Sequence, residues 1–173
     1  PLYNAKAIAH RMAYHSEEGE EEIAVLSEAQ RLSFKRVRIS KLNEQKRFQT
    51  LDDLYDFLQE CADKSRLVIV NTKKAALMIY KAVKDISPEN TFYLSTDLCA
   101  AHRHDVFQTM HQKLKEKEPI LCISTQLIEA GVDVDFAVVV RSLAGIDSIV
   151  QAAGRCNREG KRDSGEMKLI DLP

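Results

Sequence analysis

The sequence lacks any apolar stretch long enough to cross a membrane. A transmembrane helix takes roughly 20 apolar residues, and no run in the 173 residues approaches that length. The N-terminus also has no basic segment followed by an apolar one, which is the pattern of a secretion signal. We therefore expect a soluble protein of the cytoplasm.

Excess charge of one sign is missing as well. The chain has 25 Lys and Arg against 26 Asp and Glu, and its formal net charge is −1. The overall field of the protein therefore does not draw it to nucleic acid, and any such contact must come from local groups.

Sequence patterns typical of metal sites are absent. The four cysteines form no C-x-x-C pair, so we expect reduced thiols rather than a zinc site. His102, His104 and Asp105 are close in sequence, but side chains at alternate positions near a helix start diverge. We expect them to be surface residues and predict no metal site.

Two signatures of a complete nucleotide-hydrolysing site are also missing. The phosphate-binding loop G-x-x-x-x-G-K-[ST] does not occur, because the only Gly-Lys pair, Gly160-Lys161, is followed by Arg162. No D-E-x-[DH] follows an apolar strand either. The chain alone therefore carries at most half of such a site.

From residue 67 the sequence alternates short apolar runs with amphipathic segments. Buried strands are predicted at 67–70, 92–94, 120–124 and 136–140, and helices at 73–84 and 102–115. This alternation is typical of a parallel sheet with helices on both faces. We predict an α/β fold of three layers around a mainly parallel, twisted sheet.

The N-terminal part is less regular. Residues 1–48 are predicted to form a flanking segment, partly helical, with an edge strand near 34–39. The main domain is predicted to span 49–173 and to begin with a helix behind Thr50, a good N-cap. Because no repeat or Pro/Gly/Ser-rich linker occurs, we expect one structural domain overall.

Polar pairs follow three of the predicted strands. Each pair by itself reads as a cap for the next helix, but the carboxyl ends of parallel strands meet at one edge, where such sheets bind ligands. Three pairs at that edge predict a track for a sugar-phosphate backbone, because hydroxyls and amides bind phosphates without reading bases. The pairs are Asn71-Thr72, Ser95-Thr96 and Ser124-Thr125.

Two arginines near the C-terminus suit anion recognition. Residues 151–160 read Q-A-A-G-R-C-N-R-E-G, and the spacing predicts Arg155 and Arg158 on one face of a helix. Gly154 before them permits a close backbone approach to a neighbour. A guanidinium stays charged and matches phosphate oxygens, although such a pair alone also fits the solvated end of a surface helix.

Two segments in this order resemble motifs V and VI of superfamily two helicases. Residues 124–136 read S-T-Q-L-I-E-A-G-V-D-V-D-F, and the arginine-bearing segment follows about twenty residues later. The residues of these two segments are similar to those of the CRISPR-associated helicase-nuclease of type I systems. The resemblance covers residues 67–173 and implies the second of two RecA-like domains.

The resemblance implies roles for ten residues. Groups that would reach across a cleft and act on ATP are Arg155, Arg158 and Gln151. Groups that would lie against the nucleotide are Gly131, Asp133 and Gly154, although Asp133 equally fits a turn or cap. Groups that would hold the phosphates of the translocated strand are Asn71, Thr72, Ser124 and Thr125.

The resemblance also implies partners. ATP with Mg²⁺ would be bound mainly by a missing first RecA-like domain, so the chain alone is expected to hydrolyse almost none. Single-stranded DNA and a CRISPR surveillance complex would be the other partners. Two alternatives stay open: the C-terminal domain of another superfamily two helicase, acting on RNA, and a RecA-like binding module without enzymatic activity.

Overall fold

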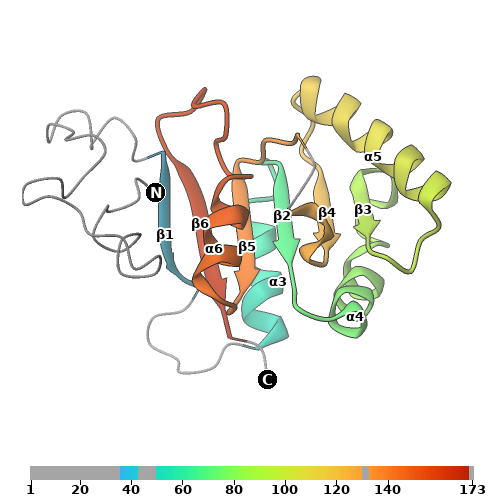
Figure 1. The fold of residues 1–173 in the computed structure, drawn as a ribbon, viewed down its shortest axis with the longest axis horizontal. Helices are drawn as coiled ribbons and strands as arrows, with labels where there is room; N and C mark the ends of the chain where they lie inside the picture. Colours follow the sequence, from blue (N-terminus) through green and yellow to red (C-terminus); the bar gives the residue numbers. More distant parts are fainter. Residues whose placement is uncertain (1–35, 43–49, 130–132, 172–173) are drawn as a thin grey trace, which may run out of the picture. The chain divides into compact units, whose positions relative to one another are not determined.

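Parallel strands form a single sheet through the middle of the described structure (Figure 1). The computed structural model describes residues 36–42, 50–129 and 133–171. Its strands are β1 (Val37–Lys41), β2 (Arg66–Ile69), β3 (Thr91–Leu94), β4 (Leu121–Ser124), β5 (Val138–Ser142) and β6 (Gly165–Ile170). They lie in the order β1-β6-β5-β2-β4-β3, and each neighbouring pair is parallel.

Helices cover both faces of the sheet. On one face, α3 (Leu51–Glu60) and α4 (Lys73–Val83) contribute buried side chains to one apolar cluster. On the other, α5 (Ala100–Lys115) and α6 (Ile146–Ala153) contribute to a second cluster. Two short 3-10 helices, η1 (Pro88–Asn90) and η2 (Gln126–Ile128), join the remaining elements. The predicted three-layer α/β fold is confirmed.

Local capping fixes where the helices of one face begin. Thr50 accepts a hydrogen bond from the Asp53 amide, and the Asp53 carboxylate accepts one from the Thr50 amide. Such a reciprocal pair satisfies two amides that a helix start leaves unbonded. Thr72 caps α4 in a simpler way, because its hydroxyl accepts from the Ala75 amide at 3.1 Å.

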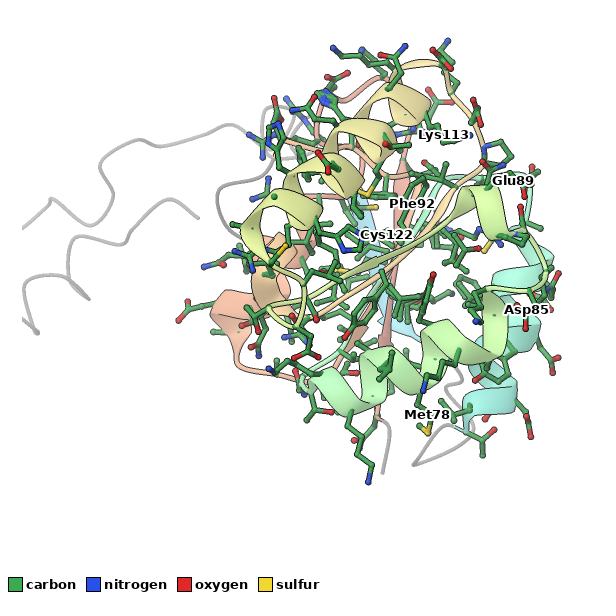
Figure 2. All side chains as sticks on the ribbon, turned by 90° about the vertical axis from the view of Figure 1, so that its right-hand side faces the viewer. Met78, Asp85, Glu89, Phe92, Lys113 and Cys122 are labelled. Carbon is green, nitrogen blue, oxygen red and sulfur yellow. The ribbon has the colours of Figure 1, made fainter. Side chains whose placement is uncertain are left out.

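The helix α5 packs on the sheet through one apolar face. Met110 is fully buried, and Val106, Phe107 and Leu114 pack against the cluster to which it belongs. Figure 2 shows Phe92 and Cys122 on the strands that α5 covers, and Met78 projecting from α4 away from the sheet. Burial raises the pKa of the Cys122 thiol to about 12, so this cysteine is a neutral core side chain.

The strand β1 is an edge of the sheet and pairs with β6. The sheet therefore includes part of the segment 1–48 that we set apart as flanking. The rest of that segment, residues 1–35 and 43–48, lies outside the described residues, so its predicted helical part stays a prediction. Among the described residues, no helix is both long and apolar enough to cross a bilayer.

Candidate functional site

The three polar pairs predicted from the sequence do lie at one edge of the sheet. In the register of the central strands, Ser124 is level with Ile69 of β2 and with Leu94 of β3. The residues at the ends of these strands, or directly after them, therefore lie together at the lower side of the sheet in Figure 1. We call them the strand-end rim: Asn71, Thr72, Ser95, Thr96, Ser124 and Thr125.

Several polar groups of the strand-end rim already have partners inside the protein. The Ser124 hydroxyl is fully buried, 2.9 Å from the carbonyl oxygens of Leu94 and Thr125. Asn71 donates from its side-chain amide to the Leu143 carbonyl at 2.8 Å. These bonds fix the shape of the rim, whereas Asn71 and Thr72 remain exposed at its surface.

A cation on the strand-end rim was missed at the sequence level. Lys73, the first residue of α4, lies 2.6 Å from Asp97, and both side chains are about half exposed. Its hydrogen bond holds the pKa of the Asp97 carboxyl below its usual range. A lysine directly after the helix cap Thr72 is the signal that could have identified it.

The two arginines do not lie on a helix, which corrects the sequence prediction. The helix α6 ends at Ala153, Gly154 is its C-cap, and the chain then turns with Asn157 at φ 47°. Glycine is a weak helix former, and asparagine tolerates this left-handed backbone. Arg155 and Arg158 therefore project from residues 154–160, which we call the arginine turn.

Long-range hydrogen bonds hold the arginine turn against the start of β5. The Phe136 amide donates to the Arg155 carbonyl at 2.9 Å, and the Asn157 amide donates to the Phe136 carbonyl at 3.0 Å. The Asn157 side chain also donates to the carbonyls of Arg36 and Arg162. Asn157 is thus a positioning residue that sequence reasoning overlooked.

The arginine turn brings together two residues predicted to bind nucleotide. Arg158 Nε lies 3.1 Å from an oxygen of Asp133, and the two side chains are 45% and 83% exposed. Asp135 accepts from the Arg158 amide at 2.8 Å and pairs with Arg162 at 3.2 Å. Asp135 was missed, although its alternation with Asp133 in the sequence V-D-V-D was a usable signal.

Arg155 is placed differently from Arg158. It is only 8% exposed, and its Nη2 donates to the Glu129 carbonyl at 2.7 Å. Burial and then the charge of Arg158 lower the pKa of Arg155, while Asp133 opposes this shift. Arginine nevertheless stays protonated, so the arginine turn holds two positive charges close together.

The other predicted nucleotide contacts have separate positions. Gln151 is exposed on α6, just before the arginine turn. Gly154 has φ −65°, and the atoms nearest to a Cβ built on it belong to Val150 and Gln151 of its own helix. The expected close approach to a neighbouring segment is therefore not found at Gly154, and Gly131 lies outside the described residues.

An open cavity of about 460 Å³ lies beside Asp133 and Asp135, at the end of the sheet where the strands begin, opposite the strand-end rim. Its lining includes Asp133 and Asp135 with Arg162 and Lys161, so charges of both signs face it. Within residues 36–42, 50–129 and 133–171, no three His, Cys, Asp or Glu side chains gather in a way that could hold a metal ion.

The family model and the relatives that match this chain carry the same family name. Residues 62–161 match the family model described as CRISPR-associated nuclease/helicase Cas3, C-terminal. A protein of that name from Methanothermobacter thermautotrophicus is 30% identical over 121 residues, covering 69% of this chain and 14% of the relative. The namesake from Haloferax volcanii is 57% identical over 56 residues, covering 31% of this chain and 6% of the relative.

A solved structure shows the same fold. The crystal structure of T. fusca Cas3-ADP superposes with a TM-score of 0.65 at 17% identity, covering 80% of this chain and 18% of that one. The chain thus spans less than a fifth of the length of each of these three relatives. It belongs to the Cas3 C-terminal family and is a C-terminal RecA-like domain of a superfamily two helicase.

Proposed function

We propose that this chain is the second RecA-like domain of an ATP-dependent DNA helicase that acts in type I CRISPR interference. The observation that carries the proposal is the pairing of Asp133 with Arg158 at 3.1 Å on an exposed surface. These two residues come from the two segments that resemble separate helicase motifs, and Asp133 lines the cavity, so Arg158 pairs with a residue of its lining. Family membership supplies the helicase context.

Arg158 is the group that we assign to the phosphates of ATP. In this proposal ATP and Mg²⁺ are held mainly by a first RecA-like domain, and Arg158 completes the site from across the cleft. A fixed arginine stabilises the charge that develops on the transferred phosphoryl group. Asp133 holds the guanidinium in place in the free domain and lies near the sugar once the nucleotide is bound.

Arg155 and Gln151 support this chemistry from either side of Gly154. The Arg155 guanidinium is held by the Glu129 carbonyl, so it adds positive potential at short range while it fixes the preceding segment. Gln151 is exposed on α6, and we assign it to positioning the terminal phosphate or the attacking water. Gly131 and Gly154 would lie close to the nucleotide.

The strand-end rim is the surface that we assign to single-stranded DNA. Phosphate oxygens would accept hydrogen bonds from Asn71, Thr72 and Thr125. Ser124 would stabilise the rim through its buried hydroxyl, and Lys73 would add one positive charge. Neutral groups bind phosphates weakly enough to release them at each step, and they do not read the sequence. Such contacts suit a motor that moves along any strand.

The proposal is tested with the parent protein and with the isolated chain. The parent is expected to hydrolyse ATP faster with single-stranded DNA than with RNA, and the isolated chain is expected to hydrolyse almost none, because both halves of the cleft are needed. Stimulation by RNA alone would instead identify another superfamily two helicase. Absence of ATP hydrolysis in the intact parent would favour a binding module.

A further inference from the structure

A buried ion pair lies beneath the strand-end rim and belongs to neither predicted site. Arg141 of β5 is completely buried, and its Nε lies 2.7 Å from a carboxylate oxygen of Glu129. Glu129, which directly follows η2, is 5% exposed. Arg141 is also among the largest fully buried side chains of the described residues.

Contacts continue from this pair in both directions. On one side, Arg141 Nη1 donates to the side-chain oxygen of Asn71 at 2.6 Å. On the other, the Glu129 carbonyl accepts from Arg155 at 2.7 Å. Four residues thus form a continuous path from the strand-end rim to the arginine turn, and its two ends lie in the two surfaces assigned above.

Stability alone does not account for a pair of this kind. Moving both charges out of water is costly, and well-packed apolar residues in their place often leave a protein equally or more stable. The cost here is higher still, since Nη2 of Arg141 is buried without a hydrogen-bond partner in the described part of the chain. What such a pair does supply is a fixed geometry for the segments that it joins.

We propose that Arg141 and Glu129 are positioning residues that couple the DNA surface to the nucleotide surface. Arg141 holds the Asn71 side chain and the segment after β4 in one register. A phosphate that displaces Asn71 or Thr125 changes this register, and Glu129 passes the change to Arg155. This inference rests on the proposed function, because it needs both surfaces to be occupied by the ligands assigned above.

The test uses the parent protein with ATPase rates measured at saturating ATP, with and without single-stranded DNA. Removing one partner leaves an unpaired buried charge and risks unfolding, so the main variant replaces both, Glu129→Leu with Arg141→Met. Arg66→Met is the matched control. Arg66 is another buried arginine, at the opposite end of β2 from Asn71, and donates to the Leu58 carbonyl at 2.7 Å.

The double variant is expected to melt near the wild-type temperature and to keep its basal ATPase and its KM for ATP. Its stimulation by DNA is expected to fall by about tenfold, the range that residues of a coupling network reach. Arg66→Met should retain the full stimulation. A folded double variant with wild-type stimulation would overturn the inference, and so would equal losses of basal and stimulated rates.

Failure of the proposed function looks different from failure of this inference. If the wild-type parent shows no DNA-stimulated ATPase, the function itself is wrong. If the wild type is stimulated and Arg158→Ala abolishes turnover, while the double variant behaves as wild type, the function stands. In that case only the coupling role of Arg141 and Glu129 is lost.

Discussion

The strand-end rim and the arginine turn lie at opposite edges of one sheet, and they are held in different ways. On the rim, local bonds from the Ala75 amide to Thr72 and from the Asp97 amide to Ser95 shape the turns after β2 and β3, and Asn71 adds a bond to a carbonyl 72 positions away. In the arginine turn, Asn157 bonds a carbonyl 121 positions away, just before β1. The rim is therefore held by local and distant bonds together, whereas the place of the arginine turn on the sheet depends on distant bonds.

The largest effect is expected at the arginine turn. Arg158→Ala in the parent protein should lower DNA-stimulated ATP turnover by about 10³-fold, because the charge developing on the phosphoryl group loses its arginine. Affinity for single-stranded DNA should not change, since the strand-end rim is untouched. Steady-state ATPase assays and DNA titrations measure the two quantities.

Lys161→Ala is the control for charge in the same loop, because Lys161 is exposed and pairs with Glu159. It should leave turnover unchanged. If Arg158→Ala also hydrolyses ATP at the wild-type rate, the arginine turn has no role in the chemistry.

A second change tests how tightly the arginine turn packs on β6. A Cβ added at Gly165 would lie 2.6 Å from Cys156 Sγ and 2.8 Å from Asn157 Cβ. Gly165→Ala should therefore reduce the free energy of unfolding by about 1–3 kcal/mol. Urea unfolding of the chain measures it.

Gly145→Ala provides the comparison, because nothing lies within 4 Å of a Cβ at Gly145. Gly145 is the N-cap of α6, where alanine is less favourable than glycine, so the unfolding free energy of this variant should fall by about 0.5–1 kcal/mol, less than for Gly165→Ala. Equal stabilities of the two alanine variants would mean that the turn relaxes without cost.

On the strand-end rim, Thr125→Ala should act on DNA more than on nucleotide. Loss of one hydrogen bond to a phosphate should raise the DNA concentration for half-maximal ATPase by roughly threefold to tenfold. The KM for ATP should stay constant. Thr109→Ala removes an exposed hydroxyl from α5 and should change neither value; a Thr125 variant that alters only the KM would contradict the assignment.

The smallest effect is expected for Lys73→Ala. If Lys73 neutralises one phosphate, the slope of log affinity against log salt should become shallower by about 0.7 for a single strand. Fluorescence titrations at several salt concentrations would measure it. Lys81→Ala, in the last turn of the same helix, should leave the slope as it is, and identical slopes for all three proteins would remove Lys73 from the DNA surface.

Most elements of the sheet were predictable because their signals are local. Apolar runs and amphipathic spacing located β2 to β4 and the helices α4 and α5 within about two residues, which is the usual precision at element ends. Thr50 was recognised as a cap for the same reason. β6 was not among the predicted strands, and its position between β1 and β5 carries no local signal.

The candidate site was predictable in composition but not in arrangement. Arg158 and Asp133 were both named as site residues. The helix expected to carry the arginines nevertheless ends at Ala153, because the hydrogen bond from the Asn157 amide to the Phe136 carbonyl holds the chain in a turn. Asp135 was missed although the alternation V-D-V-D was a usable signal, and Arg141 was missed because its partners are set by tertiary packing. A lone arginine in the apolar run of β5 gives no indication that it is completely buried.

The pairing of the outer strand β1 with β6 also bears on how the domain is made. β6 is the last strand of the described residues and sits between β1 and β5. Among the described strands, β6 is the one that pairs with β1, so during synthesis this pairing waits until residue 170 has left the ribosome. Contacts so far apart in sequence form slowly, so the pairing of β1 with β6 is a late step in the folding of this sheet.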